Sequence, residues 1–112
     1  MARYTNLFVS VLPARNLRES LPDVLQSCGL HMVYQDGDYM MAKELPGGVS
    51  YSQLATVEVL IGSTETTTEQ VRENSAATVN LVVKNEELPL KANNHCRQIF
   101  QRVNQAIERK AS

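Results

Sequence analysis

Residues 30–45 read "LHMVYQDGDYMMAKEL", with two apolar runs on either side of Asp36-Gly37. A dipeptide of this kind supplies the positive φ angles that a two-residue turn between adjacent antiparallel strands needs. The sequence therefore predicts a β-hairpin that turns at Asp36-Gly37 and is stabilised by a tyrosine pair near the turn. The residues expected to face each other across the two strands are Gln35 and Asp38, Tyr34 and Tyr39, Val33 and Met40, and Met32 and Met41.

Three other stretches alternate as half-buried strands do. They are residues 4–12 ("YTNLFVSVL"), 53–62 ("QLATVEVLIG") and 77–85 ("ATVNLVVKN"). In the last two, one face is apolar and the other is mixed, which is typical of an antiparallel sheet with one solvated side. The apolar sets are Leu7, Val9 and Val11 in the first stretch, Ala55, Val57, Val59 and Ile61 in the second, and Val79, Leu81 and Val83 in the third.

A first helix is predicted over residues 14–28, where apolar residues recur at helical spacing. Gly29 is placed as the left-handed cap after the last turn. Pro22 leaves two alternatives open, because a proline inside a helix removes one hydrogen bond and clashes with the preceding turn. Either the helix kinks there, or it begins near Ser20, whose side chain would cap it with Asp23 three residues on.

A second helix is predicted from residues 93–107, which read "NNHCRQIFQRVNQAI". Asn93 or Asn94 supplies the N-cap, where a short amide side chain satisfies a free backbone N–H. Cys96 is the first member of the buried stripe. His95 is expected to be exposed in the first turn, beside the positive end of the helix dipole. The adjacent histidine and cysteine are therefore explained by the start of a helix, without a catalytic role.

The order of these elements is β-α-β-β-β-β-α, which predicts a single α+β domain over residues 1–112. We expect a two-layer sandwich in which helices cover one face of an antiparallel sheet. This order resembles the helix-grip proteins and a single repeat of the TATA-box-binding-protein-like fold. The polar stretch at residues 63–76 is expected to be a long loop or a weakly ordered extension of a hairpin.

Composition narrows the classes of function. The chain has 112 residues and a formal net charge of −1, without the clustered basic residues that nucleic-acid binding requires. No apolar run is long enough to span a membrane, and no signal peptide is recognisable, so we expect a cytoplasmic protein that binds neither nucleic acid nor membrane. Two cysteines in a reducing compartment are expected to remain free.

No catalytic residues, metal ligands or cofactor motifs are assigned. Cys28 and Cys96 could meet His31 and His95 only if the two helix ends are neighbours, and both thiols lie on apolar stripes where burial makes them inert. A thiol-dependent enzyme or redox sensor is therefore the weakest of three hypotheses. The acidic pair Glu86-Glu87 is expected to lie in a solvated bend.

The favoured hypothesis is a non-enzymatic binding or regulatory protein that contacts a protein partner through the open face of the sheet. The alternative is a carrier of a small apolar ligand, with a cavity between the sheet and the C-terminal helix. A homodimer is also possible through an unpaired strand edge at residues 77–85 or 4–12. The protein-binding residues would be Tyr34, Tyr39, Thr56, Glu58, Asn80 and Lys84, and the cavity of the alternative would be lined by Met32, Met40, Met41 and Phe100.

Three stretches resemble small, poorly characterised proteins of cyanobacteria. They are residues 1–13 ("MARYTNLFVSVLP"), 37–47 ("GDYMMAKELPG") and 85–100 ("NEELPLKANNHCRQIF"). Together the resemblance covers most of the chain. It implies a cyanobacterial cytoplasmic setting, and it carries over no activity.

Overall fold

The computed structural model describes residues 1–63 and 77–111. The loop predicted at residues 63–76 therefore falls, apart from Ser63, outside the described residues. The element order is the predicted one, with one added turn of 3-10 helix at Tyr51–Gln53. The elements are β1 (Ala2–Ser10), α1 (Ala14–Ser27), β2 (Leu30–Asp36), β3 (Tyr39–Glu44), β4 (Thr56–Ser63), β5 (Ala77–Asn85) and α2 (His95–Ala111).

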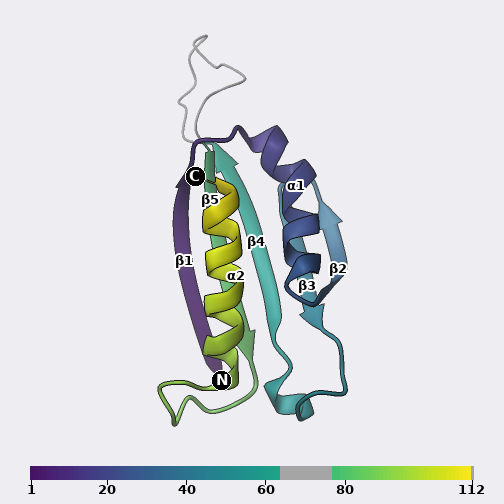
Figure 1. Ribbon diagram of the computed structural model, residues 1–112, viewed down its shortest axis with the longest axis vertical. Helices are drawn as coiled ribbons and strands as arrows, with labels where there is room; N and C mark the ends of the chain where they lie inside the picture. The colour runs from purple at the N-terminus through teal and green to yellow at the C-terminus, as the bar shows by residue number, and fades with distance from the viewer. Residues whose placement is uncertain (64–76, 112) are drawn as a thin grey trace.

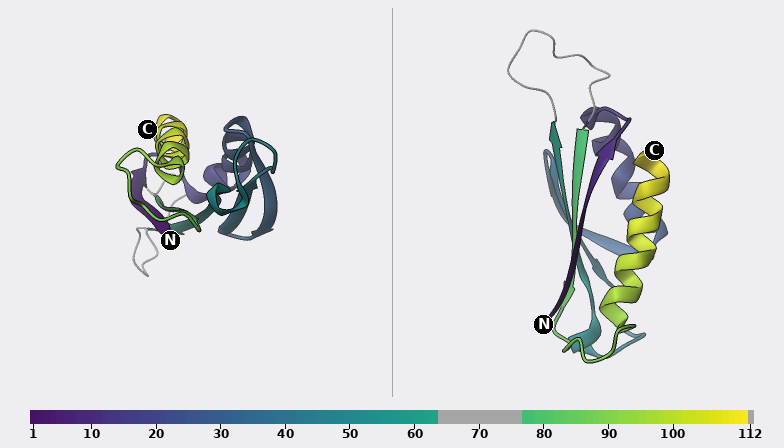
Figure 2. Two further views of the ribbon diagram at one scale, coloured as in Figure 1. Left: turned by 90° about the horizontal axis from the view of Figure 1, so that it is seen from below. Right: turned by 90° about the vertical axis from the view of Figure 1, so that its left-hand side faces the viewer.

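The strands form one antiparallel sheet in the order β1-β5-β4-β3-β2. Both helices lie on the same face of it (Figures 1 and 2). Helix α2 packs on β1 and β5, whereas α1 packs on β2 and β4, and the two helices also contact each other. This confirms the α+β two-layer architecture, and it leaves the other face of the sheet without a helix (Figure 2).

The core lies between the helices and the sheet. The apolar sets predicted for residues 55–61 and 79–83 all point into it and are almost completely buried. The helices complete the core with stripes at helical spacing. These stripes are Leu17, Leu21 and Leu25 in α1, and Cys96, Ile99, Val103 and Ile107 in α2.

The first strand differs from the prediction in its bounds and in the face it buries. It ends at Ser10, before Val11, and its core-facing side chains include Tyr4 and Phe8. The predicted apolar set points the other way, so that Leu7 and Val9 are 57% and 70% exposed. Both alternating sets in this strand contain large apolar residues, and the pattern alone therefore did not identify the buried one.

The hairpin of β2 and β3 turns one residue later than predicted. Asp36 pairs with Tyr39, so the two loop residues are Gly37 and Asp38. Gly37 has a φ of +60°, and no other type of residue within the described part of the chain has a positive φ. A turn at Asp36-Gly37 would place Asp36 in that strained region, whereas a turn that starts at Gly37 needs only glycine there. The tyrosine pair still forms diagonally, with ring centroids 5.9 Å apart.

Helix α1 runs without interruption from Ala14 through Pro22 to Ser27. The alternative that it begins near Ser20 is wrong. The Ser20 hydroxyl donates a hydrogen bond to the Asn16 carbonyl oxygen at 2.7 Å, as a residue within a helix does. Gly29 follows the helix with a φ of +86°, as predicted for the left-handed cap.

The sheet edges are β1 and β2. Strand β5, residues 77–85, pairs with β1 on one side and with β4 on the other. It is therefore not an edge, which removes one of the two strands suggested for a homodimer. Strand β1 pairs only with β5 within the sheet, and that edge remains available.

Candidate functional site

The start of α2 confirms that Asn94 is the N-cap. Its side-chain oxygen accepts a hydrogen bond from the Arg97 N–H at 2.9 Å, and its amide group donates to the Tyr4 hydroxyl at 2.7 Å. His95 is less exposed than predicted, because its Nε2 lies 2.8 Å from Oε1 of Glu44. The first turn is thereby tied to β1 through Tyr4 and to the end of β3 through Glu44.

Cys96 is completely buried beneath α2. Its Sγ lies 3.5 Å from the Val83 carbonyl oxygen and 3.7 Å from that of Ala2. Burial, reinforced by the charges of Glu87 and Glu44, raises the pKa of Cys96 to about 11. A thiol of this kind is protonated at neutral pH and packs as a small apolar side chain.

Cys28 lies at the C-terminal end of α1 and is 8% exposed. Burial raises its pKa, while a hydrogen bond with Ser27 and the charges of Arg102 and Arg109 oppose that shift. It borders a groove between the helices that contains no histidine among its lining residues. Neither cysteine therefore has an imidazole partner in its described surroundings of the kind a thiol nucleophile needs.

The four residues suggested for an apolar cavity are not brought together. Met40 is fully buried in β3, and Met32 is partly buried against the same core. Met41 pairs with Glu58 on the face away from the helices. Phe100 packs on Tyr4 of β1, with ring centroids 5.7 Å apart, on the α2 side of the core. Met41 therefore lies on the opposite face of the sheet from the core against which the other three pack.

The six residues suggested for protein binding all lie on the open face of the sheet. The strand pairing places Thr56 opposite Lys84, and Asn80 between Leu60 and Leu7. The other three residues are Glu58 on β4, Tyr39 on β3 and Tyr34 on β2.

Several polar groups on this face bind one another. The Tyr39 hydroxyl donates to Oε2 of Glu58 at 3.0 Å, and Lys84 Nζ lies 3.6 Å from the same oxygen. Burial and the neighbouring Glu58 carboxylate raise the pKa of Tyr39, which keeps its hydroxyl protonated as a donor. These mutual contacts leave the apolar side chains as the prominent feature of the face.

Apart from Tyr34 and Tyr39, the exposed apolar side chains of this face were not among the binding residues suggested from the sequence. Leu7, Val9, Tyr34 and Leu60 are each about half exposed or more. A hollow of about 280 Å³ lies beside Leu60, lined by side chains from β3, β4 and β5. We define the open-face patch as Leu7, Val9, Tyr34, Tyr39, Met41, Leu60 and Val82. The alternation in residues 4–12 would have indicated this patch if its apolar set had been assigned to the open face.

Two kinds of site can be assessed across residues 1–63 and 77–111. No group of three or more histidine, cysteine or acidic side chains is placed to hold a metal ion. No helix in this part of the chain has the length and apolar character needed to cross a bilayer.

Comparison with known proteins shows no family for this chain. No family model matches the chain, and no curated protein sequence matches it. Among solved structures, one titled "Crystal structure of Ara h 8.0201" is similar, with 12% sequence identity and a TM-score of 0.45. The match covers 98% of this chain and 97% of the other.

Proposed function

We propose that this chain is a non-enzymatic binding protein, with a regulatory role, that docks a protein partner on the open face of its sheet. The observation that carries the proposal is the open-face patch. Single exposed apolar residues are common on protein surfaces, but a contiguous group of them characterises interaction sites. Here the group spans strands from β1 to β2 on a face that neither helix covers (Figure 2).

The patch has the arrangement of a protein interface, in which an apolar centre is surrounded by polar groups. The hollow beside Leu60 and Val82 can accept one apolar side chain of a partner. Arg3, Lys84 and Lys43 lie along one end of the face, and Asp36 lies at the other. A partner that presents an apolar anchor, with acidic groups toward the basic end, would complement both features.

The two free cysteines support a cytoplasmic setting, in a cyanobacterium according to the resemblance described above. Both are buried and unpaired. Thiols in this state are typical of proteins that work in a reducing compartment.

The test compares two double variants in recovery of proteins from a native lysate. Leu7→Arg/Leu60→Arg places two charges in the patch, whereas Leu88→Arg/Leu90→Arg makes the same change at two exposed leucines elsewhere. A partner should be retained by the wild-type chain and by the second variant. The patch variant should bind it about 30-fold more weakly or worse, since loss of a central apolar contact costs about 2 kcal/mol or more.

Equal recovery of every specific partner by both double variants would contradict the proposal. Thermal unfolding of each variant provides the control for folding. Because all four leucines are exposed, both variants should unfold within a few degrees of the wild-type chain.

A further inference from the structure

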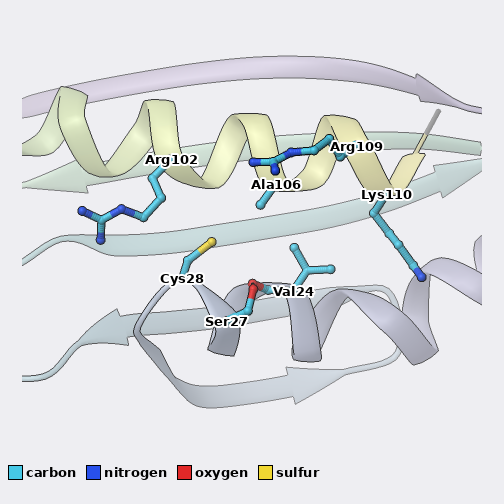
Figure 3. Close-up of a pocket in the computed structure, with 7 residues that line it drawn as sticks. All are labelled: Val24, Ser27, Cys28, Arg102, Ala106, Arg109 and Lys110. Carbon is cyan, nitrogen blue, oxygen red and sulfur yellow. The ribbon is translucent and has the colours of Figure 1, made fainter.

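A second candidate site lies on the helix side of the molecule, where α1 and α2 run next to each other. A groove of about 410 Å³ follows this seam (Figure 3). Its volume falls in the range of small-molecule sites in proteins. The site is separated from the open-face patch by the sheet, and it does not depend on the proposed function.

The lining of the groove is strongly basic. Arg102, Arg109 and Lys110 line it from α2, and none of its lining residues is acidic. Arg109 and Lys110 follow Arg102 at i+7 and i+8, so that a single face of α2 presents all three cations to α1. In Figure 3 the Arg109 guanidinium lies beside Ala106, whereas the Arg102 side chain extends away from the Cys28 sulphur, so the two guanidinium groups stand at separate places along the seam.

The floor of the groove is mostly apolar. Val24 and Ala106 are partly buried against the core, and Cys28, which is buried, lines the groove with them. Ser27 adds a hydroxyl, which donates to the Val24 carbonyl oxygen at 2.6 Å and, beside its hydrogen bond with Cys28, keeps one lone pair free to accept. The groove therefore combines an apolar surface with positive charges along its rim.

The helix dipoles do not explain all three cations. Arg109 and Lys110 lie in the last turn of α2, where positive charge is favourable. Arg102 lies well before that turn, beyond the reach of this effect. It is also not needed at the end of α1, because the Leu25 and Gln26 carbonyl oxygens already accept hydrogen bonds from Cys28 and Gly29.

We propose that this groove binds a small organic anion that carries a phosphate or carboxylate group on an apolar body. Arginine suits both groups, because its planar fork can donate two parallel hydrogen bonds to their oxygens. The apolar body would lie on Val24 and Ala106, while the anionic group is held by Arg102 or Arg109. The volume of the groove exceeds what an inorganic phosphate fills, which favours a ligand with an organic part.

The test titrates three probes into isotope-labelled protein and follows amide chemical shifts. The probes are 1-naphthyl phosphate, 1-naphthol and inorganic phosphate, which present the body and the charge together and then each alone. We expect saturable shifts at Val24, Ser27 and Ala106, with 1-naphthyl phosphate at least tenfold tighter than either other probe. Equal affinity for naphthol, or for inorganic phosphate, would overturn the proposal.

A matched pair of variants tests the residues. Arg102→Gln/Arg109→Gln removes two charges from the groove, and Lys91→Gln/Arg97→Gln removes two from exposed positions near the start of α2, outside the groove. The first variant should bind 1-naphthyl phosphate at least tenfold more weakly, and the second should bind it as the wild-type chain does. Equal weakening in both, or binding only to anionic lipid vesicles and to no soluble probe, would show a general charge effect and would refute the site.

Discussion

At the scale of single residues, Glu87 stabilises a helix that lies further along the chain. Its Oε1 accepts a hydrogen bond from the backbone N–H of Cys96, in the first turn of α2, at 2.8 Å. It also accepts one from the Asn85 side-chain amide at 2.8 Å. Together with the Asn94 cap, Glu87 satisfies donors that the helix itself leaves free. The sequence analysis had expected Glu87 in a solvated bend, because no local pattern links it to that helix.

Replacing Glu87 with alanine should therefore destabilise the fold by about 1–2 kcal/mol, the usual cost of losing a helix cap. The neighbouring Glu86 is exposed, so Glu86→Ala provides a matched control and should change the free energy of unfolding by less than about 0.5 kcal/mol. Urea denaturation at pH 7 gives both values. Equal stability of the two variants would show that the carboxylate does not stabilise the helix.

The effect of Glu87 should also depend on pH. Burial alone would raise its pKa, but the hydrogen bonds from Asn85 and Cys96 outweigh that and lower it from the ordinary value of 4.5. The folded state binds this proton less tightly than the unfolded state, so the carboxylate contributes its stability above pH 4.5 and loses it as the pH falls through the lowered pKa. The difference in unfolding free energy between the wild-type chain and Glu87→Ala should thus be constant from pH 5 to pH 7 and shrink below about pH 4.5. A difference that grows on acidification would contradict this sign.

At the scale of elements, the β2–β3 hairpin shows what local chemistry can and cannot predict. The composition around Gly37 correctly identified a two-residue turn. It did not distinguish a turn that starts at Asp36 from one that starts at Gly37. The two turns give different strand registers, and the register decides which side chains of the hairpin face the core. The register observed is the one that buries Met40 in the core beneath α1.

Gly37→Ala should destabilise the protein by about 1–2 kcal/mol, because its φ of +60° is costly for a residue with a Cβ. Gly48 is a suitable control, since its φ lies outside the positive region and a Cβ there meets nothing within 4 Å. Gly48→Ala should leave stability unchanged or raise it slightly. Thermal unfolding of the two variants is sufficient, and a similar loss in both would indicate that Gly37 is not a strained turn position.

The buried faces of the strands were predictable only where the alternation was one-sided. In β4 and β5 the apolar set alternates with mostly polar residues, and the buried face was identified correctly. In β1 the set containing Leu7 and the set containing Phe8 both include large apolar residues. The helices cover Phe8 and leave Leu7 exposed, a choice made by the packing of α2 on β1. The open-face patch was underestimated for this reason.

At the scale of the whole molecule, both candidate sites arise from how the layers meet. The six residues suggested from the sequence lie on the open face because strand periodicity assigns faces reliably once one face is known. The groove was missed because it joins the flank of α2 to the last turn of α1, and no periodicity within one helix predicts which flank a second helix will approach. The spacing of Arg102, Ala106 and Arg109 along one side of α2 was the only signal in the sequence.

The layered architecture also predicts how the two thiols react. Cys96 lies between α2 and the sheet and is inaccessible unless those layers separate, whereas Cys28 borders the solvent-filled groove. In Cys28→Ala, labelling of the remaining Cys96 should therefore require global unfolding, and its rate should rise with urea as steeply as the equilibrium unfolding transition. In Cys96→Ala, labelling of Cys28 should be faster and depend only weakly on urea, since a local fluctuation exposes it.

Both thiols should react more slowly than free cysteine at pH 7, because burial raises both pKa values. Rapid labelling of Cys96 without urea would mean that α2 detaches from the sheet in the native state, and would restore the hypothesis of a thiol-based function.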